Sequence, residues 1–189
     1  MRIRWRGFEL PTKVVCEEAT KTDRYAKFVV EPFERGFGST IGNSLRRVLL
    51  SSLEGAAITT IRFENVLHEF SAMEGVLEDT ADIILNIKQL RIKVRDDGPV
   101  TIKIDVKKKG VVTGADVQTE AGVEIANKDL HIATLTKQVH FQCDMTVEKG
   151  RGYRTAEENE KEGLEIGRIP IDSIFSPVLR VKYSTQDTR

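Results

Sequence analysis

Three glycines stand where the chain is expected to turn from a strand into a helix. Gly36, Gly38 and Gly42 follow the strand-like residues 25–30 and open an amphipathic segment. Backbone N–H groups at the start of a helix attract anions, so the glycines raise the hypothesis of a phosphate-binding loop. Their spacing is G-x-G-x-x-x-G, whereas dinucleotide loops need G-x-G-x-x-G and triphosphate loops end in Gly-Lys-Ser/Thr. We therefore expect a tight turn and close helix packing, and keep a small nucleotide-binding enzyme that uses Gly36–Gly42 as the alternative function.

Histidine and cysteine give no support for a metal site or a nucleophile. His68, His131 and His140 fall on separate expected elements, and none has a partner at a metal-ligand spacing such as H-x-x-x-H. Cys16 and Cys143 form no cluster, and a chain of 189 residues does not need a disulfide, so both are expected to be reduced thiols. A G-x-S-x-G motif is absent. We predict no catalytic residue, no metal site and no cofactor.

The composition is typical of a soluble globular protein without a strong overall charge. Hydrophobic residues make up 40% and charged residues 31% of the chain. The 29 Lys and Arg balance the 29 Asp and Glu, so net charge does not attract nucleic acid or anionic lipid. No run approaches the roughly 18–20 apolar residues that cross a bilayer, and no apolar secretory signal opens the chain. We expect a cytoplasmic protein without a membrane partner.

The first helix is predicted over residues 41–54. Its inner stripe has helical spacing and consists of Ile41, Leu45, Val48, Leu49 and Leu53. Arg47 and Leu50 fall on the opposite side, where an apolar anchor beside a guanidinium is typical of protein interfaces. The alternative is a solvated helix face, and the residues alone leave both interpretations open.

The second helix is predicted over residues 74–88, with Leu85 on its outer side. Its inner stripe consists of Val76, Thr80, Ile83, Ile84 and Ile87. Alternating or β-branched runs predict strands over residues 25–30, 57–63, 100–106, 139–147 and 178–183. The alternation makes Cys143 a packed core thiol. Residues 154–165 are rich in glutamate and predict a mobile loop.

Long ordered blocks of the sequence resemble the N-terminal domain of the bacterial RNA polymerase alpha subunit. The blocks are FVVEPFERGFGSTIGNSLRRVLLSSLEGAAIT at residues 28–59, VLHEFSAMEGVLEDTADIILNIKQL at 66–90, GRGY at 150–153 and IGRIPIDSIFSPV at 166–178. The resemblance runs nearly from end to end. The pattern ERGFG-x-T-x-GN-x-LRR-x-LLSS is far longer than a short motif, so the chain is identified as a member of this family.

The resemblance implies an α+β fold in two parts. Residues 1–54 and 168–189 would form a dimerisation subdomain from both chain ends, and residues 55–167 would form an inserted β-rich assembly subdomain. In the family, two alpha subunits pair through the helix of the LRR block, and the dimer is the platform on which the beta and beta-prime subunits assemble. The implied role is a non-catalytic scaffold in transcription, with the nucleotidyltransferase activity belonging to the whole DNA-directed RNA polymerase. A generic adaptor dimer outside transcription would use the same kind of interface and is a further alternative.

The resemblance also assigns roles to individual positions. The residues that would contact or shape the beta interface are Glu34, Arg35, Arg47 and Leu50. The residues that would be presented toward beta-prime are Lys88 and Ile171. The residues that would be divided between the core of the chain and the dimer seam are Ile41, Leu45, Val48 and Leu49.

Family members continue past residues 178–183 into more sheet, a long helix of the dimer interface, a linker and a small DNA-binding domain. The sequence does not contain these parts. The resemblance therefore implies a dimerisation subdomain that is incomplete on its C-terminal side, and no direct DNA binding by this chain. It leaves the strength of the dimer open, because obligate interfaces depend on a large buried area.

Overall fold

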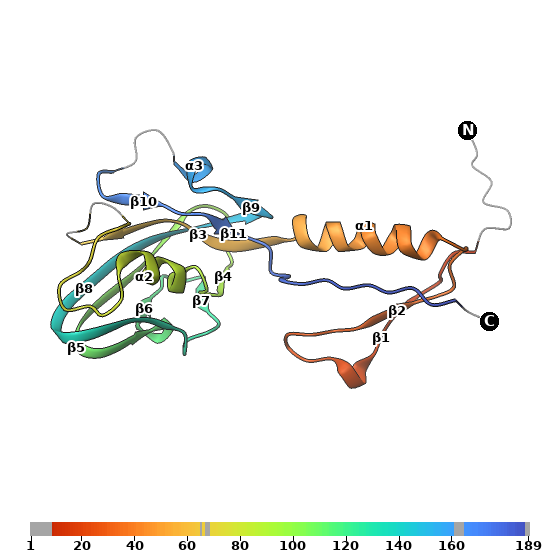
Figure 1. Cartoon of the computed structure of the whole chain (residues 1–189), viewed down its shortest axis with the longest axis horizontal. Coiled ribbons are helices and arrows are strands. Elements are labelled where there is room, and N and C mark those ends of the chain that lie inside the picture. The colour runs from red at the N-terminus through yellow and green to blue at the C-terminus, as the bar shows by residue number, and fades with distance from the viewer. Residues whose placement is uncertain (1–8, 65, 67–68, 161–164, 188–189) are drawn as a thin grey trace. The chain divides into compact units, whose positions relative to one another are not determined.

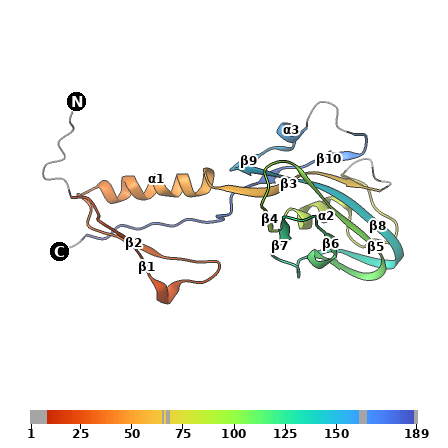
Figure 2. The same cartoon turned by 180° about the vertical axis from the view of Figure 1, so that it is seen from behind.

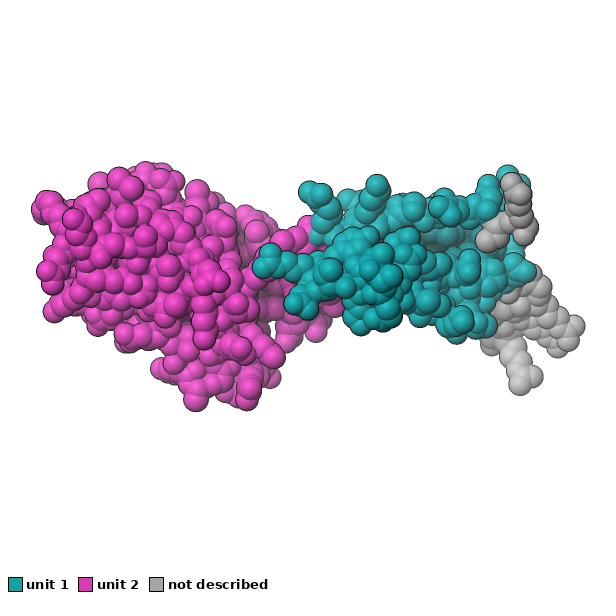
Figure 3. Space-filling model, turned by 90° about the horizontal axis from the view of Figure 1, so that it is seen from below, with its two compact units in different colours: residues 1–49, 180–189 teal, residues 50–179 magenta. Residues whose placement is uncertain are grey.

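A computed structural model describes residues 9–64, 66, 69–160 and 165–187. The chain divides into two compact units, one made of residues 1–49 and 180–189 and the other of residues 50–179 (Figure 3). Strands predominate over a few helices, which is compatible with the predicted α+β class. Each unit is described in turn.

The first unit contains a β-hairpin and most of one long helix (Figure 1). Strand β1 (Val14–Cys16) pairs antiparallel with β2 (Phe28–Val30), and a single 3-10 turn, η1 (Glu18–Thr20), lies between them. Helix α1 (Phe37–Ser51) follows. The helix starts earlier than predicted because Gly36, at φ +86°, completes the turn that precedes it.

The second unit is built on an antiparallel five-stranded sheet in the order β10-β3-β8-β5-β6. Its strands are β3 (Glu54–Phe63), β5 (Val100–Thr113), β6 (Val117–Gln118), β8 (His131–Arg151) and β10 (Arg168–Pro170). Two further ribbons pair β4 (Ile92–Val94) with β7 (Val123–Ile125) and β9 (Tyr153–Arg154) with β11 (Ser173–Ile174). The remaining elements are α2 (Thr80–Ile87), η2 (Gly114–Asp116) and α3 (Ala156–Asn159).

The hydrophobic core of the second unit lies between one face of the sheet and α2. Along β8, alternate residues are buried, namely Phe141, Cys143, Met145 and Val147. The predicted inner stripe of the second helix is confirmed at Thr80, Ile83, Ile84 and Ile87, which are all buried. Burial raises the pKa of the Cys143 thiol well above its usual value, as expected for a packed core thiol.

Helix α2 is shorter than the sequence pattern predicts. It begins only at Thr80, because the Asp79 carboxylate accepts the Asp82 N–H at 2.8 Å and caps the first turn. The preceding residues form an irregular segment in which Gly75 has φ +80°, a conformation that ends any helix. This segment pairs with β8 instead, where the Leu77 N–H donates to the Thr134 carbonyl at 2.9 Å.

Two other predictions are corrected. Residues 154–165 contain a short helix, α3, whose Thr155 and Glu158 form a capping box, so the described part is not simply a mobile loop. Residues 178–183 form no strand, because no described strand lies beside them to make a ladder. Residues 168–179 lie in the second unit, where β10 pairs with β3 and β11 pairs with β9.

Two substitutions on α2 test the assignment of its buried face. Ile83 is fully buried, so Ile83→Ala should lower the free energy of unfolding of the second unit by about 2–5 kcal/mol. Leu85 is 58% exposed, so Leu85→Ala should change it by no more than about 0.5 kcal/mol. Urea titrations followed by far-UV circular dichroism measure both. Equal effects of the two variants would contradict this orientation of α2.

Candidate assembly surfaces

The first candidate surface is the apolar stripe of α1. Leu45 and Val48 are each 51% exposed, and Phe37 is also exposed, while Ile41 and Leu49 are only half-buried. The sequence left open how this stripe divides between the core of the chain and a dimer seam, and in the structure Leu45 and Val48 are the members that stay exposed. Among the described residues of the first unit none is buried, so this unit cannot enclose the stripe. Apolar side chains at this spacing and exposure form a surface suited to another protein.

The residues assigned to the beta interface lie around the two ends of α1. Glu34 and Arg35 are exposed in the turn that precedes the helix, and Arg47 is exposed on its outer side. Leu50, predicted to point outward, is half-buried. It lies in the last turn of the helix, close to the point where the chain enters β3, so the helical periodicity alone overestimates its exposure.

The glycines of α1 serve backbone geometry. A Cβ atom at Gly42 would lie 2.5 Å from Cδ2 of the Tyr183 ring, and one at Gly38 would lie 3.0 Å from Cγ2 of Thr185. The C-terminal segment of the first unit therefore runs beside α1 (Figures 1 and 2), and at Gly42 it approaches so closely that a side chain there would meet the Tyr183 ring. With the positive φ of Gly36, this confirms the tight turn and close packing expected from the spacing.

The second candidate surface lies in the second unit, at the end of α2. Lys88 Nζ is 3.6 Å from Oδ2 of Asp172, and the Asp172 carboxylate also accepts the Ala156 N–H at 2.9 Å. The Tyr153 hydroxyl hydrogen-bonds to the same carboxylate. The hydrogen bond from Ala156, with the Lys88 charge, lowers the pKa of Asp172, whereas partial burial and Asp172 raise the pKa of Tyr153. The GRGY block, through Tyr153, and the IPID block, through Asp172, thus meet at the ionised and exposed carboxylate of Asp172.

Ile171 does not belong to this surface. Its side chain is only 4% exposed and packs in the core, while its N–H donates to the Thr59 carbonyl at 3.0 Å. Neighbouring residues of an extended segment point to opposite sides, so the exposed member of the block is Asp172. The sequence alone did not identify Asp172 or Tyr153. The position of Asp172 between the apolar Ile171 and the small Ser173 does indicate a polar side chain that points away from the core.

A buried amide holds this region in place. Asn159 is 1% exposed and donates to the Ile171 carbonyl at 2.6 Å and to the Ser173 hydroxyl at 2.9 Å. Ser173 in turn donates to the Ile58 carbonyl at 2.6 Å, which connects α3 to the central sheet. Satisfied buried networks of this kind fix one arrangement of the backbone. Asn159 was not identified from the sequence, because it lies within the glutamate-rich residues 154–165.

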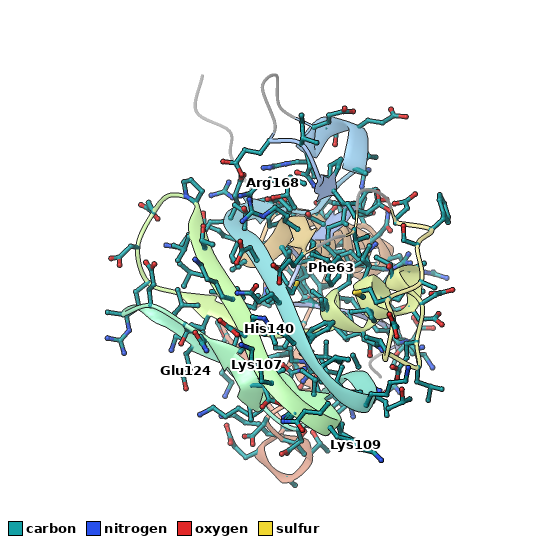
Figure 4. The ribbon with its side chains drawn as sticks, turned by 90° about the vertical axis from the view of Figure 1, so that its left-hand side faces the viewer. Phe63, Lys107, Lys109, Glu124, His140 and Arg168 are labelled. Carbon is teal, nitrogen blue, oxygen red and sulfur yellow. The ribbon has the colours of Figure 1, made fainter. Side chains whose placement is uncertain are left out.

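The histidines are engaged in pairs with carboxylates. His131 Nε2 lies 2.9 Å from Oε1 of Glu78, and His140 Nε2 lies 2.7 Å from Oδ1 of Asp105. His140 is the cross-strand neighbour of Lys107 on the β5–β8 ladder (Figure 4). His68 lies outside the described residues. No group of three or more His, Cys, Asp or Glu within the described ranges has the geometry to hold a metal ion.

The helices can be compared with the dimensions of a bilayer. Where the chain is described, none of them combines the length and apolar character required for a membrane span.

Glu78 provides a pH-dependent contribution to stability. Partial burial raises its pKa, but hydrogen bonds from the Thr134 N–H at 2.7 Å, from the Thr134 hydroxyl and from His131 outweigh this, and the pKa is lowered overall. A carboxyl with a lowered native pKa stabilises the fold above its unfolded pKa and loses that effect as the pH falls through the native value.

We therefore expect Glu78→Gln to lower the free energy of unfolding by about 1–3 kcal/mol at pH 7. The difference from wild type should shrink as the pH falls below about 4.3. Urea titrations between pH 7 and pH 3 measure it. Glu74→Gln is the matched control, because the Glu74 side chain is 90% exposed and its substitution should have little effect. A difference that does not depend on pH would contradict the role of the carboxylate charge.

The chain is similar to known proteins over most of its length. Residues 60–176 match the family described as the RNA polymerase Rpb3/RpoA insert domain. The chain is 52% identical over 189 residues to a DNA-directed RNA polymerase subunit alpha from Rhodopirellula baltica. The aligned region covers 100% of this chain and 57% of that protein. It is also 52% identical over 177 residues to the same subunit from two strains of Desulfitobacterium hafniense, covering 94% of this chain and 56% of each relative.

The chain thus spans little more than half the length of these relatives. The similarity nevertheless extends over both units, and the family match alone covers more than half of the residues. The resemblance seen in the sequence is confirmed, and the chain belongs to the RNA polymerase Rpb3/RpoA insert-domain family, among the bacterial RNA polymerase alpha subunits.

Proposed function

We propose that this chain is a non-catalytic assembly subunit of bacterial RNA polymerase, in which a homodimer binds the beta and beta-prime subunits in the cytoplasm. The observation that carries the proposal is the exposed apolar stripe of α1 in a unit where no described residue is buried. The polymerase activity would belong to the complex. Membership of the alpha-subunit family supports the choice of transcription over a generic adaptor role.

Physical chemistry favours a second copy as the occupant of the α1 stripe. The side of the helix that carries Phe37, Leu45 and Val48 contains no charged residue, so two copies can meet there without repulsion between like charges. Full burial of one large apolar side chain is worth about 1.5–3 kcal/mol. A dimerisation subdomain formed from both chain ends is therefore part of the proposal.

The remaining interfaces are assigned by position. Glu34 and Arg35 would contact the beta subunit from the turn before α1, and Arg47 and the half-buried Leu50 would contact it from the last turns of the helix. The group formed by Lys88, Asp172 and Tyr153 would meet beta-prime, since an ionised carboxylate with a bound lysine is a specific polar contact.

No observation favours the nucleotide-binding alternative. The close approach of Tyr183 to Gly42 and the turn at Gly36 account for the glycines. Calorimetric titration with ATP and NAD should show no binding, and micromolar affinity would revive the alternative. Identification of the proteins that co-purify with the chain separates the polymerase role from that of a generic adaptor.

The central experiment is light scattering on a sizing column, with the chain alone and mixed with the beta subunit. We expect two copies of the chain bound to one beta subunit. A monomer that does not associate with beta would contradict the proposal.

A charge placed in the α1 stripe should prevent pairing. Leu45→Glu would bring two carboxylates into the seam of the dimer, so light scattering should report a monomer at concentrations where the wild type is a dimer. Leu85→Glu is the matched control, because Leu85 is comparably exposed but lies on α2. Its oligomeric state should equal that of the wild type. Loss of pairing in both variants would show that the effect is not specific to α1.

Arg47→Ala tests the beta interface. We expect the affinity for the beta subunit to fall by about 2 kcal/mol or more, as at an arginine hot spot, with an unchanged circular dichroism spectrum. Arg46→Ala serves as the control, because Arg46 is exposed on a different side of the same helix. Calorimetric titration of beta into each variant measures the difference. An unchanged affinity for Arg47→Ala would remove this residue from the interface.

A further inference from the structure

The first unit contains a contact between its two chain ends that the proposed dimer does not by itself explain. The Tyr183 ring lies over Gly42, where an added Cβ would be 2.5 Å from Cδ2, 2.9 Å from Cγ and 3.0 Å from Cε2. Three ring atoms at this distance mean that the ring occupies the space that any other residue at position 42 would fill. We call this contact the Tyr183–Gly42 seat.

The seat is adjacent to the exposed stripe of α1. At 100° per residue, Gly38, Gly42 and Leu49 fall within about 40° of one another on the helix surface. Leu45 lies on the neighbouring sector, one turn from Gly42. Gly42 and Leu49 are half-buried, whereas Leu45 is half-exposed, so the C-terminal segment covers one flank of the apolar stripe and leaves the other open.

Tyr183 itself is only partly covered. Its side chain is 42% exposed although three of its ring atoms face Gly42. Part of the ring therefore stays open to solvent next to the covered flank of α1. A large aromatic ring with a fixed position is the residue type most often found at the centre of protein interfaces.

From these observations we propose that Tyr183 is a positioning residue for dimerisation. Seated on Gly42, it holds residues 180–187 along α1, and helix and segment together form the surface that a second copy contacts. The inference rests on the proposed homodimer and adds that the surface is composite. A helix without this segment would have a narrower stripe and a weaker dimer.

Substitutions at both sides of the seat test the inference. In the 189-residue chain, Tyr183→Ala and Gly42→Ala should each weaken the dimer about tenfold or more in sedimentation equilibrium. Alanine favours a helix more than glycine does, so weaker pairing by Gly42→Ala would not result from loss of the helix. Tyr183→Phe keeps the ring and should retain wild-type affinity. The double variant should be no weaker than either single variant, because both remove one contact.

Two variants are matched controls. Gly38→Ala faces only the methyl group of Thr185, at 3.0 Å, which can rotate away, so it should have little effect. Tyr25→Ala removes a tyrosine that is 57% exposed in the hairpin loop of the same unit, and it should also have little effect. Wild-type affinity of Tyr183→Ala, or equal weakening by all four alanine substitutions, would overturn the inference.

Hydrogen exchange separates this inference from the proposed homodimer. In the wild type, the amides of residues 38–45 should exchange more slowly than in Tyr183→Ala even at concentrations where both are monomers. If the wild type never dimerises, the homodimer proposal fails, together with the part of this inference that gives Tyr183 a role in pairing. If the wild type dimerises but exchange and affinity are the same in Tyr183→Ala, only the seat is overturned.

Discussion

The structure depends on an unequal distribution of buried apolar surface between its two units. Every fully buried side chain in the described ranges belongs to residues 50–179, where one sheet face and α2 enclose a continuous core. The unit made of both chain ends has a long helix whose apolar stripe is covered on one flank only, and none of its described residues is buried. Isolated helices of this length gain little stability from propensity alone. The first unit therefore leaves apolar side chains exposed, whereas the second encloses its own core.

The long β5–β8 ladder explains why the second unit can support a specific surface at its margin. It pairs the two strands from Val100 with Val147 to Thr113 with His131, and its inward residues form the core. Segments that lack regular pairing are then attached by side chains: Glu78 holds the segment before α2, and Asn159 holds α3. These buried contacts fix the backbone around the exposed Asp172, so a region with little regular structure holds a polar group in a defined position.

The sequence predicts elements well where period and burial coincide. The alternation on β8 and the inner residues of α2 identify buried side chains correctly, because both lie against a core made by the same chain. It fails at Leu45 and Ile171 for opposite reasons. Helical periodicity identifies an apolar side of a helix but not what covers it, so it cannot distinguish the exposed Leu45 from a core residue. Ile171 was assigned to an interface by its position in the family's motif, which does not indicate that its side chain is buried. The short α2 results from the Asp79 cap and Gly75, which periodicity ignores.

The glycine-rich turn shows how the same residues support different hypotheses at different levels of structure. From spacing alone, Gly36, Gly38 and Gly42 could approach a phosphate or another part of the protein, since both need backbone without a side chain. Only the tertiary contact decides: residue 183 is about 140 positions away in the sequence, and no local pattern connects it to Gly42. Because that contact draws the C-terminal segment along α1, the helix that lacks a core within its own unit acquires one covered flank, while Leu45 on the other flank stays exposed.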